Sequence, residues 1–127
     1  SEEQHQEAYA VCTLAGSGRL GAYDGDATSA AFSSPRAVLV LPDESLLIAD
    51  TGNHRLRRVF SPGVGRTPVV ETVEPRKGWM CPVGLALTHD GAVLVCDAGH
   101  NKIKRLEMGS GTVSCFAGSG RRGHADG

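Results

Sequence analysis

The sequence repeats itself: residues 35–60 align with residues 82–107 without a gap, at an offset of 47 residues. Where residues differ, apolar types still match apolar types, as with Leu56 and Ile103. Self-similarity at such a period indicates a fold built from repeated structural units, and it constrains the architecture more than any local propensity. Identical residues anchor the alignment: Pro35 and Pro82, Asp43 and Asp90, Leu47 and Leu94, Asp50 and Asp97, Gly52 and Gly99, and Arg58 and Arg105.

Each unit predicts a meander of four short antiparallel strands, because runs rich in Val, Leu and Ile alternate with turn residues. A four-stranded meander repeated every ~40–50 residues is typical of a β-propeller blade. The second strand of each unit is apolar throughout, which indicates that both of its faces are covered. The strands are expected at residues 36–41, 46–49, 55–60 and 69–73, and at 83–88, 93–96, 102–106 and 112–117.

The third strand of each unit alternates apolar and basic residues, so one of its faces is expected to meet solvent. Repeated blades could align such charges into a stripe that binds the phosphates of RNA. Interleaved acidic residues and the scarcity of aromatic side chains favour a solvated face instead. The candidate ligand-binding residues are the basic side chains of these strands and of the loop after the first unit: Arg55, Arg57, Lys102, Lys104, Arg76 and Lys77.

Two segments resemble the core of NHL repeats: LLIADTGNHRLRRV at residues 46–59 and LVCDAGHNKIKRL at residues 94–106. Residues 14–35 are similar to the glycine-rich linker that precedes many such repeats. The resemblance implies an all-β fold, with antiparallel four-stranded blades of an NHL-type, six-bladed β-propeller. The second unit departs from the family pattern, because the family's order Asn-His, after the second strand, appears there as His100-Asn101.

The predicted organisation is a disordered lead-in at residues 1–8, followed by the outer strand of a preceding blade and a linker at 9–34. One blade then spans residues 35–81, and a second spans 82–127 with a shortened linker. Because a propeller needs ~4–8 blades, about two blades and one strand form an incomplete ring. A fragment of a longer protein is the favoured interpretation. The alternative is that several copies, such as a trimer with six blades, close the ring.

Several repeated positions are expected to be structural. Phe32 and Trp79 each stand three residues before the matched prolines Pro35 and Pro82, as a wedge between blades would. Asp50 and Asp97 are expected to accept turn N–H groups before Gly52 and Gly99, although a catalytic or metal-binding carboxylate is the alternative.

Two glycine loops, at residues 16–21 and 118–123, match G-x-G-x-x-G but follow outer strands and precede no long helix. A dinucleotide-binding loop needs that strand-to-helix setting. The glycines are therefore expected to connect blades by adopting positive φ angles.

The composition excludes few functions: the net charge is −1, and no apolar run approaches the ~20 residues of a membrane span. We expect no membrane partner, no metal or cofactor and no catalytic residue in this chain. Four cysteines without ligand spacing are expected to be buried free thiols, which favours a cytoplasmic setting, or an extracellular one if a parent carries a signal peptide. They are Cys12, Cys81, Cys96 and Cys115.

The expected function is that of a non-catalytic scaffold whose loops bind a protein partner. One alternative is an RNA-binding propeller. The other is part of a lyase or lactonase, similar to NHL propellers, whose active site lies in further blades.

Overall fold

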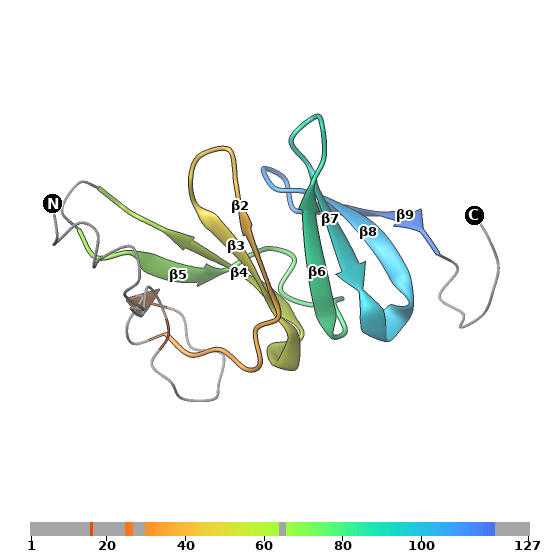
Figure 1. The fold of residues 1–127 in the computed structure, drawn as a ribbon, viewed down its shortest axis with the longest axis horizontal. Coiled ribbons are helices and arrows are strands. Elements are labelled where there is room, and N and C mark those ends of the chain that lie inside the picture. The colour runs from red at the N-terminus through yellow and green to blue at the C-terminus, as the bar shows by residue number, and fades with distance from the viewer. Residues whose placement is uncertain (1–15, 17–24, 27–29, 64–65, 119–127) are drawn as a thin grey trace, which may run out of the picture.

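The computed structural model describes residues 16, 25–26, 30–63 and 66–118, which form two antiparallel β-sheets side by side (Figure 1). The first sheet is a meander of β2 (Ala37–Val40), β3 (Leu46–Asp50), β4 (Arg55–Phe60) and β5 (Val69–Thr72). The second is a meander of β6 (Pro82–Leu87), β7 (Val93–Asp97), β8 (Lys102–Glu107) and β9 (Thr112–Ala117). The predicted all-β fold with two four-stranded antiparallel units is therefore confirmed.

One strand was not predicted. The two-residue strand β1 (Gly25–Asp26) pairs with β5 and adds a fifth strand at the outer edge of the first sheet. It lies in the segment expected to serve only as the outer strand of a preceding blade and a linker. The predicted outer strand at residues 11–15 lies outside the described residues, as do most residues of both glycine loops. Gly16 and Gly118 are described and have φ angles of +105° and +99°, which confirms the predicted positive φ at these two positions.

The turn between the second and third strands has the same form in both sheets. Short 3₁₀ turns, η1 (Thr51–Asn53) and η2 (Ala98–His100), each end at a left-handed residue, His54 or Asn101. Their φ angles are 54° and 57°. Asparagine and histidine are among the non-glycine residues that adopt this conformation most readily. The reversed Asn-His order therefore leaves a suitable residue at the left-handed position.

The two sheets pack through opposite faces. We call the side with Leu47, Ala49 and Leu56 the front face of the first sheet, and the side with Leu46, Ile48 and Val59 its back face. The same terms apply to the second sheet at positions 47 residues later. The core between the sheets joins the front face of the first sheet to the back face of the second, which carries Val93, Val95 and Leu106. The contact is therefore head to tail.

Residues before the first sheet partly cover its back face: Ala30 is buried with Val59 and Val70, and Phe32 packs beside them.

The three described cysteines form no disulfide, but the prediction that they are buried is wrong, because Cys115 is exposed and the other two are half-buried. Within the described ranges, no helix has the length and apolar character needed to traverse a lipid bilayer.

Candidate functional site

A buried ion pair closes the turn end of the first sheet. The Asp50 carboxylate, at the end of β3, accepts hydrogen bonds from the Ser33 N–H at 2.7 Å, Asn53 Nδ2 at 2.7 Å and Arg57 Nη1 at 2.8 Å. Both charged side chains are fully buried. The Arg57 guanidinium lies 5.0 Å from the centre of the Phe32 ring, a cation–π distance.

The second sheet repeats this arrangement with different residue types. The Asp97 carboxylate accepts hydrogen bonds from the Met80 N–H and from Lys104 Nζ, both at 2.7 Å, and pairs with His100 Nδ1 at 2.5 Å. Lys104 Nζ lies 5.5 Å from the centre of the Trp79 ring. Burial opposes ionisation of Asp97, but the bonds from Lys104, Met80 and His100 outweigh it and lower its pKa. Every partner lies 47 residues after its counterpart in the first sheet.

These clusters correct part of the predicted binding surface. The prediction that Arg57 faces solvent is wrong, because Arg57 shares the back face with Asp50, whose buried carboxylate neutralises it. Lys104 is only 16% exposed for the same reason. Asp50 and Asp97 accept hydrogen bonds from backbone N–H groups, as predicted. These N–H groups belong to the preceding linkers, at Ser33 and Met80, rather than to the turns that follow the aspartates. Arg55 and Lys102, also predicted to bind ligands, are half-buried.

Gly52 and Gly99 hold the same linkers against the turns. The Gly52 N–H donates to the Ser33 carbonyl, and the Gly99 N–H donates to the Met80 carbonyl, each at 2.7 Å. A Cβ at Gly52 would come within 2.7 Å of the Ser33 carbonyl oxygen, and one at Gly99 within 2.6 Å of the Met80 oxygen. Such contacts are too short for any side chain, so glycine is required for close approach rather than for an unusual φ angle.

The β2–β3 and β6–β7 hairpins turn at the opposite end of the molecule (Figure 1). A cleft of about 690 Å³ lies between the sheets at this end. Both sheets contribute to it: the first through its hairpin turn, β4 and β5, and the second through the β6–β7 and β8–β9 turns. Five charged residues line it: Asp43, Arg58, Glu71, Glu74 and Arg76. This cleft is the candidate functional site.

The charges in the cleft form two exposed ion-paired groups. Arg58 donates to Asp43 Oδ2 at 2.9 Å and to Glu71 Oε1 at 3.1 Å, and Arg76 Nε donates to Glu74 Oε1 at 3.1 Å. The Glu74 and Arg76 side chains are 68% and 53% exposed, so this pair is open to an incoming partner. Exposed pairs of this kind contribute about 0–1 kcal/mol to folding, so an exchange of partners on binding costs the fold little.

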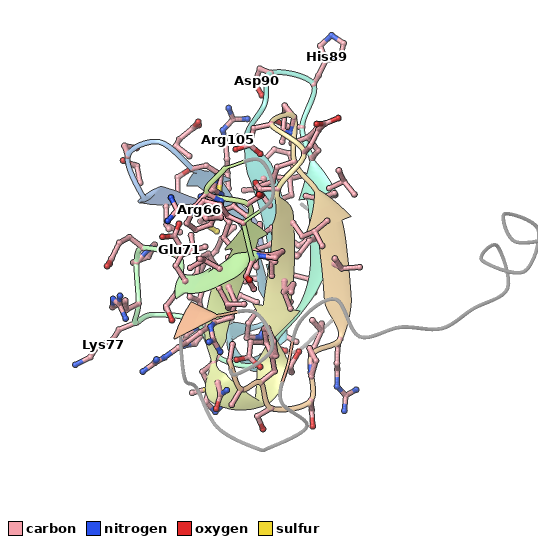
Figure 2. All side chains as sticks on the ribbon, turned by 90° about the vertical axis from the view of Figure 1, so that its left-hand side faces the viewer. Arg66, Glu71, Lys77, His89, Asp90 and Arg105 are labelled. Carbon is pink, nitrogen blue, oxygen red and sulfur yellow. The ribbon has the colours of Figure 1, made fainter. Side chains whose placement is uncertain are left out.

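The second sheet has a related ion pair at its own turn. Arg105 donates to Asp90 at 2.6 Å and to Glu107 at 2.7 Å, and Figure 2 shows Asp90 and Arg105 toward the end where His89 marks the hairpin tip. Both bonds raise the pKa of Arg105. The bond from Arg105, followed by that from the Thr88 hydroxyl, lowers the pKa of Asp90 to about 2. The Ser45 hydroxyl and N–H, followed by Arg58, lower the pKa of Asp43 to about 2.

Only one predicted ligand-binding residue, Arg76, lines the cleft. Lys77 is exposed and extends away from the sheets (Figure 2), beside the Trp79 side chain, which is only 5% exposed and packs as a structural wedge would. The sequence did carry a signal for the cleft residues that were missed. Asp43 and Arg58 both recur in the repeat as Asp90 and Arg105, which predicts a paired function for opposite charges.

The described lining of the cleft supplies charged side chains, hydroxyl groups and backbone that can contact a ligand. Its described lining has no histidine, cysteine or lysine, and its Ser110 hydroxyl donates to Thr112 at 2.8 Å rather than to a base. In the part of the chain that the structure describes, no three His, Cys, Asp or Glu side chains are grouped to hold a metal ion. Carboxylates, guanidinium groups and backbone from two sheets instead suit a polar, charged ligand.

A comparison with models of known protein families found no match for this chain, and a comparison with curated proteins found none either.

Acid should weaken the fold through Asp43, Asp90 and Asp97. Folded-state pKa values below the ordinary 3.8 mean that these carboxylates stabilise the fold above that pH and lose this contribution as the pH falls through the lowered values, which are about 2 for Asp43 and Asp90. We expect the free energy of unfolding, measured by urea titration, to fall from pH 3.8 toward about pH 2. The Asp43→Asn, Asp90→Asn double variant should show a shallower fall, and an identical fall would contradict the assignment.

Proposed function

We propose that this chain is part of a repeat-built interaction module, an NHL-type β-propeller segment that binds a protein partner through the cleft and does not itself catalyse a reaction. The repetition of one cluster in both sheets supports the repeat architecture. The Asp50 and Asp97 carboxylates each join a preceding linker, a short turn and a basic side chain. Because these clusters stabilise each unit from within, at the end opposite the hairpin turns, the hairpin turns are available to bind a partner.

The observation that carries the binding proposal is the cleft itself. Its volume of about 690 Å³ lies within the range of ligand sites, and its walls come from two sheets. Exposed Glu74 and Arg76 at its wall present both charge signs. A protein segment satisfies both signs and the exposed backbone together, whereas a nucleic acid would meet the carboxylates of Asp43, Glu71 and Glu74 as repulsive neighbours.

RNA binding is the weaker candidate, because the clusters around Asp50 and Asp97 neutralise basic residues that would otherwise contact RNA phosphates. Arg57 is paired with Asp50 inside the first sheet, and Lys104 is paired with Asp97 in the second. A lyase or lactonase site would have to be supplied by blades beyond this chain.

The test is affinity capture on the immobilised chain, followed by quantitative mass spectrometry. We compare wild type, the cleft variant Arg76→Glu and a control, His89→Asp, at the exposed hairpin tip outside the cleft lining. We expect wild type and the control to retain the same protein in equal amounts, and ribonuclease treatment not to release it. The cleft variant should retain ~10-fold less of this protein, which corresponds to a loss of about 1.4 kcal/mol in binding free energy.

Equal retention by wild type and the cleft variant would contradict the role of the cleft. Loss of capture after ribonuclease treatment would favour the RNA alternative, and filter binding to single-stranded RNA over a salt series would then measure it. Steep weakening with salt is the signature of phosphate contacts.

A further inference from the structure

The front face of the second sheet carries exposed apolar side chains as well as Arg105. Ile103 is 39% exposed, whereas its counterpart in the first sheet, Leu56, is fully buried in the core between the sheets. Phe116 follows Cys115, the strand partner of Lys104, and is 59% exposed. Its counterpart, which follows the strand partner of Arg57, is Val73, only 7% exposed. The same positions are thus covered in one sheet and uncovered in the other.

The back face of the first sheet is covered over Val59 and Val70 but exposed along its edge strand. Val38 and Val40, on the edge strand β2, are 64% and 62% exposed. They correspond to Leu85 and Leu87 of the second sheet, and Leu85 packs against the core between the two sheets. Among the residues that the structure describes, Val38 and Val40 therefore have no packed sheet like the one that covers Leu85.

We propose that the front face of the second sheet is a docking surface for the back face of the first sheet of another copy of this chain. The contact between the two sheets of one chain provides the template, because it joins a front face to a back face. A head-to-tail contact leaves an unused front face and an unused back face at opposite ends of the pair. Each copy then offers the surface that the next copy needs.

Repetition of a head-to-tail contact gives a closed ring when the rotation between neighbours closes, and a filament when it does not. Rings of two, three or four copies would contain four, six or eight sheets, which is the range of blade numbers in propellers. The docking faces do not include the charged cleft lining, so this inference does not depend on the partner that the cleft binds.

Sedimentation equilibrium of the 127-residue chain in reducing buffer tests the proposal, with circular dichroism to confirm folding. We expect wild type to form a species of discrete multiple mass as its concentration rises. A front variant, Ile103→Asp with Phe116→Asp, and a back variant, Val38→Asp with Val40→Asp, should each remain monomeric. The control His89→Asp, at an exposed hairpin tip, should assemble as wild type does.

An equimolar mixture of the two variants distinguishes head-to-tail docking from any symmetric contact. The front variant keeps an intact back face and the back variant keeps an intact front face, so the mixture should form a heterodimer and stop there. A wild-type chain that stays monomeric at every concentration would overturn the proposal, even if a variant failed to fold. Folded variants whose mixture stays monomeric, or a variant that still self-associates alone, would also overturn it.

Discussion

Replacement of Arg57 by alanine should lower the free energy of unfolding by about 3–5 kcal/mol, because it leaves the Asp50 carboxylate buried without its cation. The two side chains are fully buried and 2.8 Å apart. The variant also loses the hydrogen bond from Arg57 Nη1 to the Ala31 carbonyl and the stacking on Phe32. Urea denaturation followed by circular dichroism measures the loss.

Two further variants show that the buried pair, rather than basic charge on β4, carries the effect. Arg55→Ala removes a half-buried basic residue from the same face of the same strand and should cost far less. Arg57→Lys keeps a cation at the position where the second sheet has Lys104, and it should lie between wild type and Arg57→Ala. Equal losses for Arg55→Ala and Arg57→Ala would show that the ion pair does not support the sheet.

Replacement of Leu106 by alanine should cost about 2–5 kcal/mol, because it opens a cavity in the core between the two sheets. Leu106 is fully buried and packs with Val93 and Val95 against the front face of the first sheet. Leu87→Ala makes the same chemical change on β6 at a position that is 41% exposed, and it should cost about 1 kcal/mol or less. A similar loss for both variants, measured by urea denaturation, would contradict the packing described between the sheets.

The strand pattern could be predicted from the sequence because the repeat and the turn residues agree on it. Two strands, Arg55–Phe60 and Thr112–Ala117, have the predicted bounds, and the other predicted strands differ by a single residue at one or both ends. Strand β1 could not be predicted, because a pair of residues such as Gly25–Asp26 has no periodicity of its own. Its pairing with β5 depends on tertiary contact.

The burial of Arg57 and Lys104 shows where binary patterning fails. Alternation along β4 and β8 correctly separates two faces, but it cannot say that a basic face is buried when a carboxylate on the preceding strand neutralises it. The signal was the recurrence of an acid and a base seven positions apart, Asp50 with Arg57 and Asp97 with Lys104.

The cleft was less accessible to sequence analysis. Its lining comes from turns of both sheets and is defined by how the sheets pack, which the repeat does not specify. The charge of Arg76 predicts a ligand-binding residue, but charge alone does not show that Arg76 pairs with Glu74 at the wall of a cleft. Opposite charges two residues apart in a connecting loop can equally mark a mixed-charge binding surface.

Both sheets are built on one structural unit, in which an aspartate, a turn side chain and a basic residue make equivalent contacts. The most direct test gives the second sheet the turn and basic residues of the first, through His100→Asn with Lys104→Arg. Because Arg57 and Lys104 donate to carbonyls at matched positions, Ala31 and Gly78, the exchanged side chains have equivalent partners. We predict that the double variant unfolds in urea within about 1 kcal/mol of wild type, while Lys104→Ala loses several times more. A double variant as unstable as Lys104→Ala would contradict the equivalence of the two sheets.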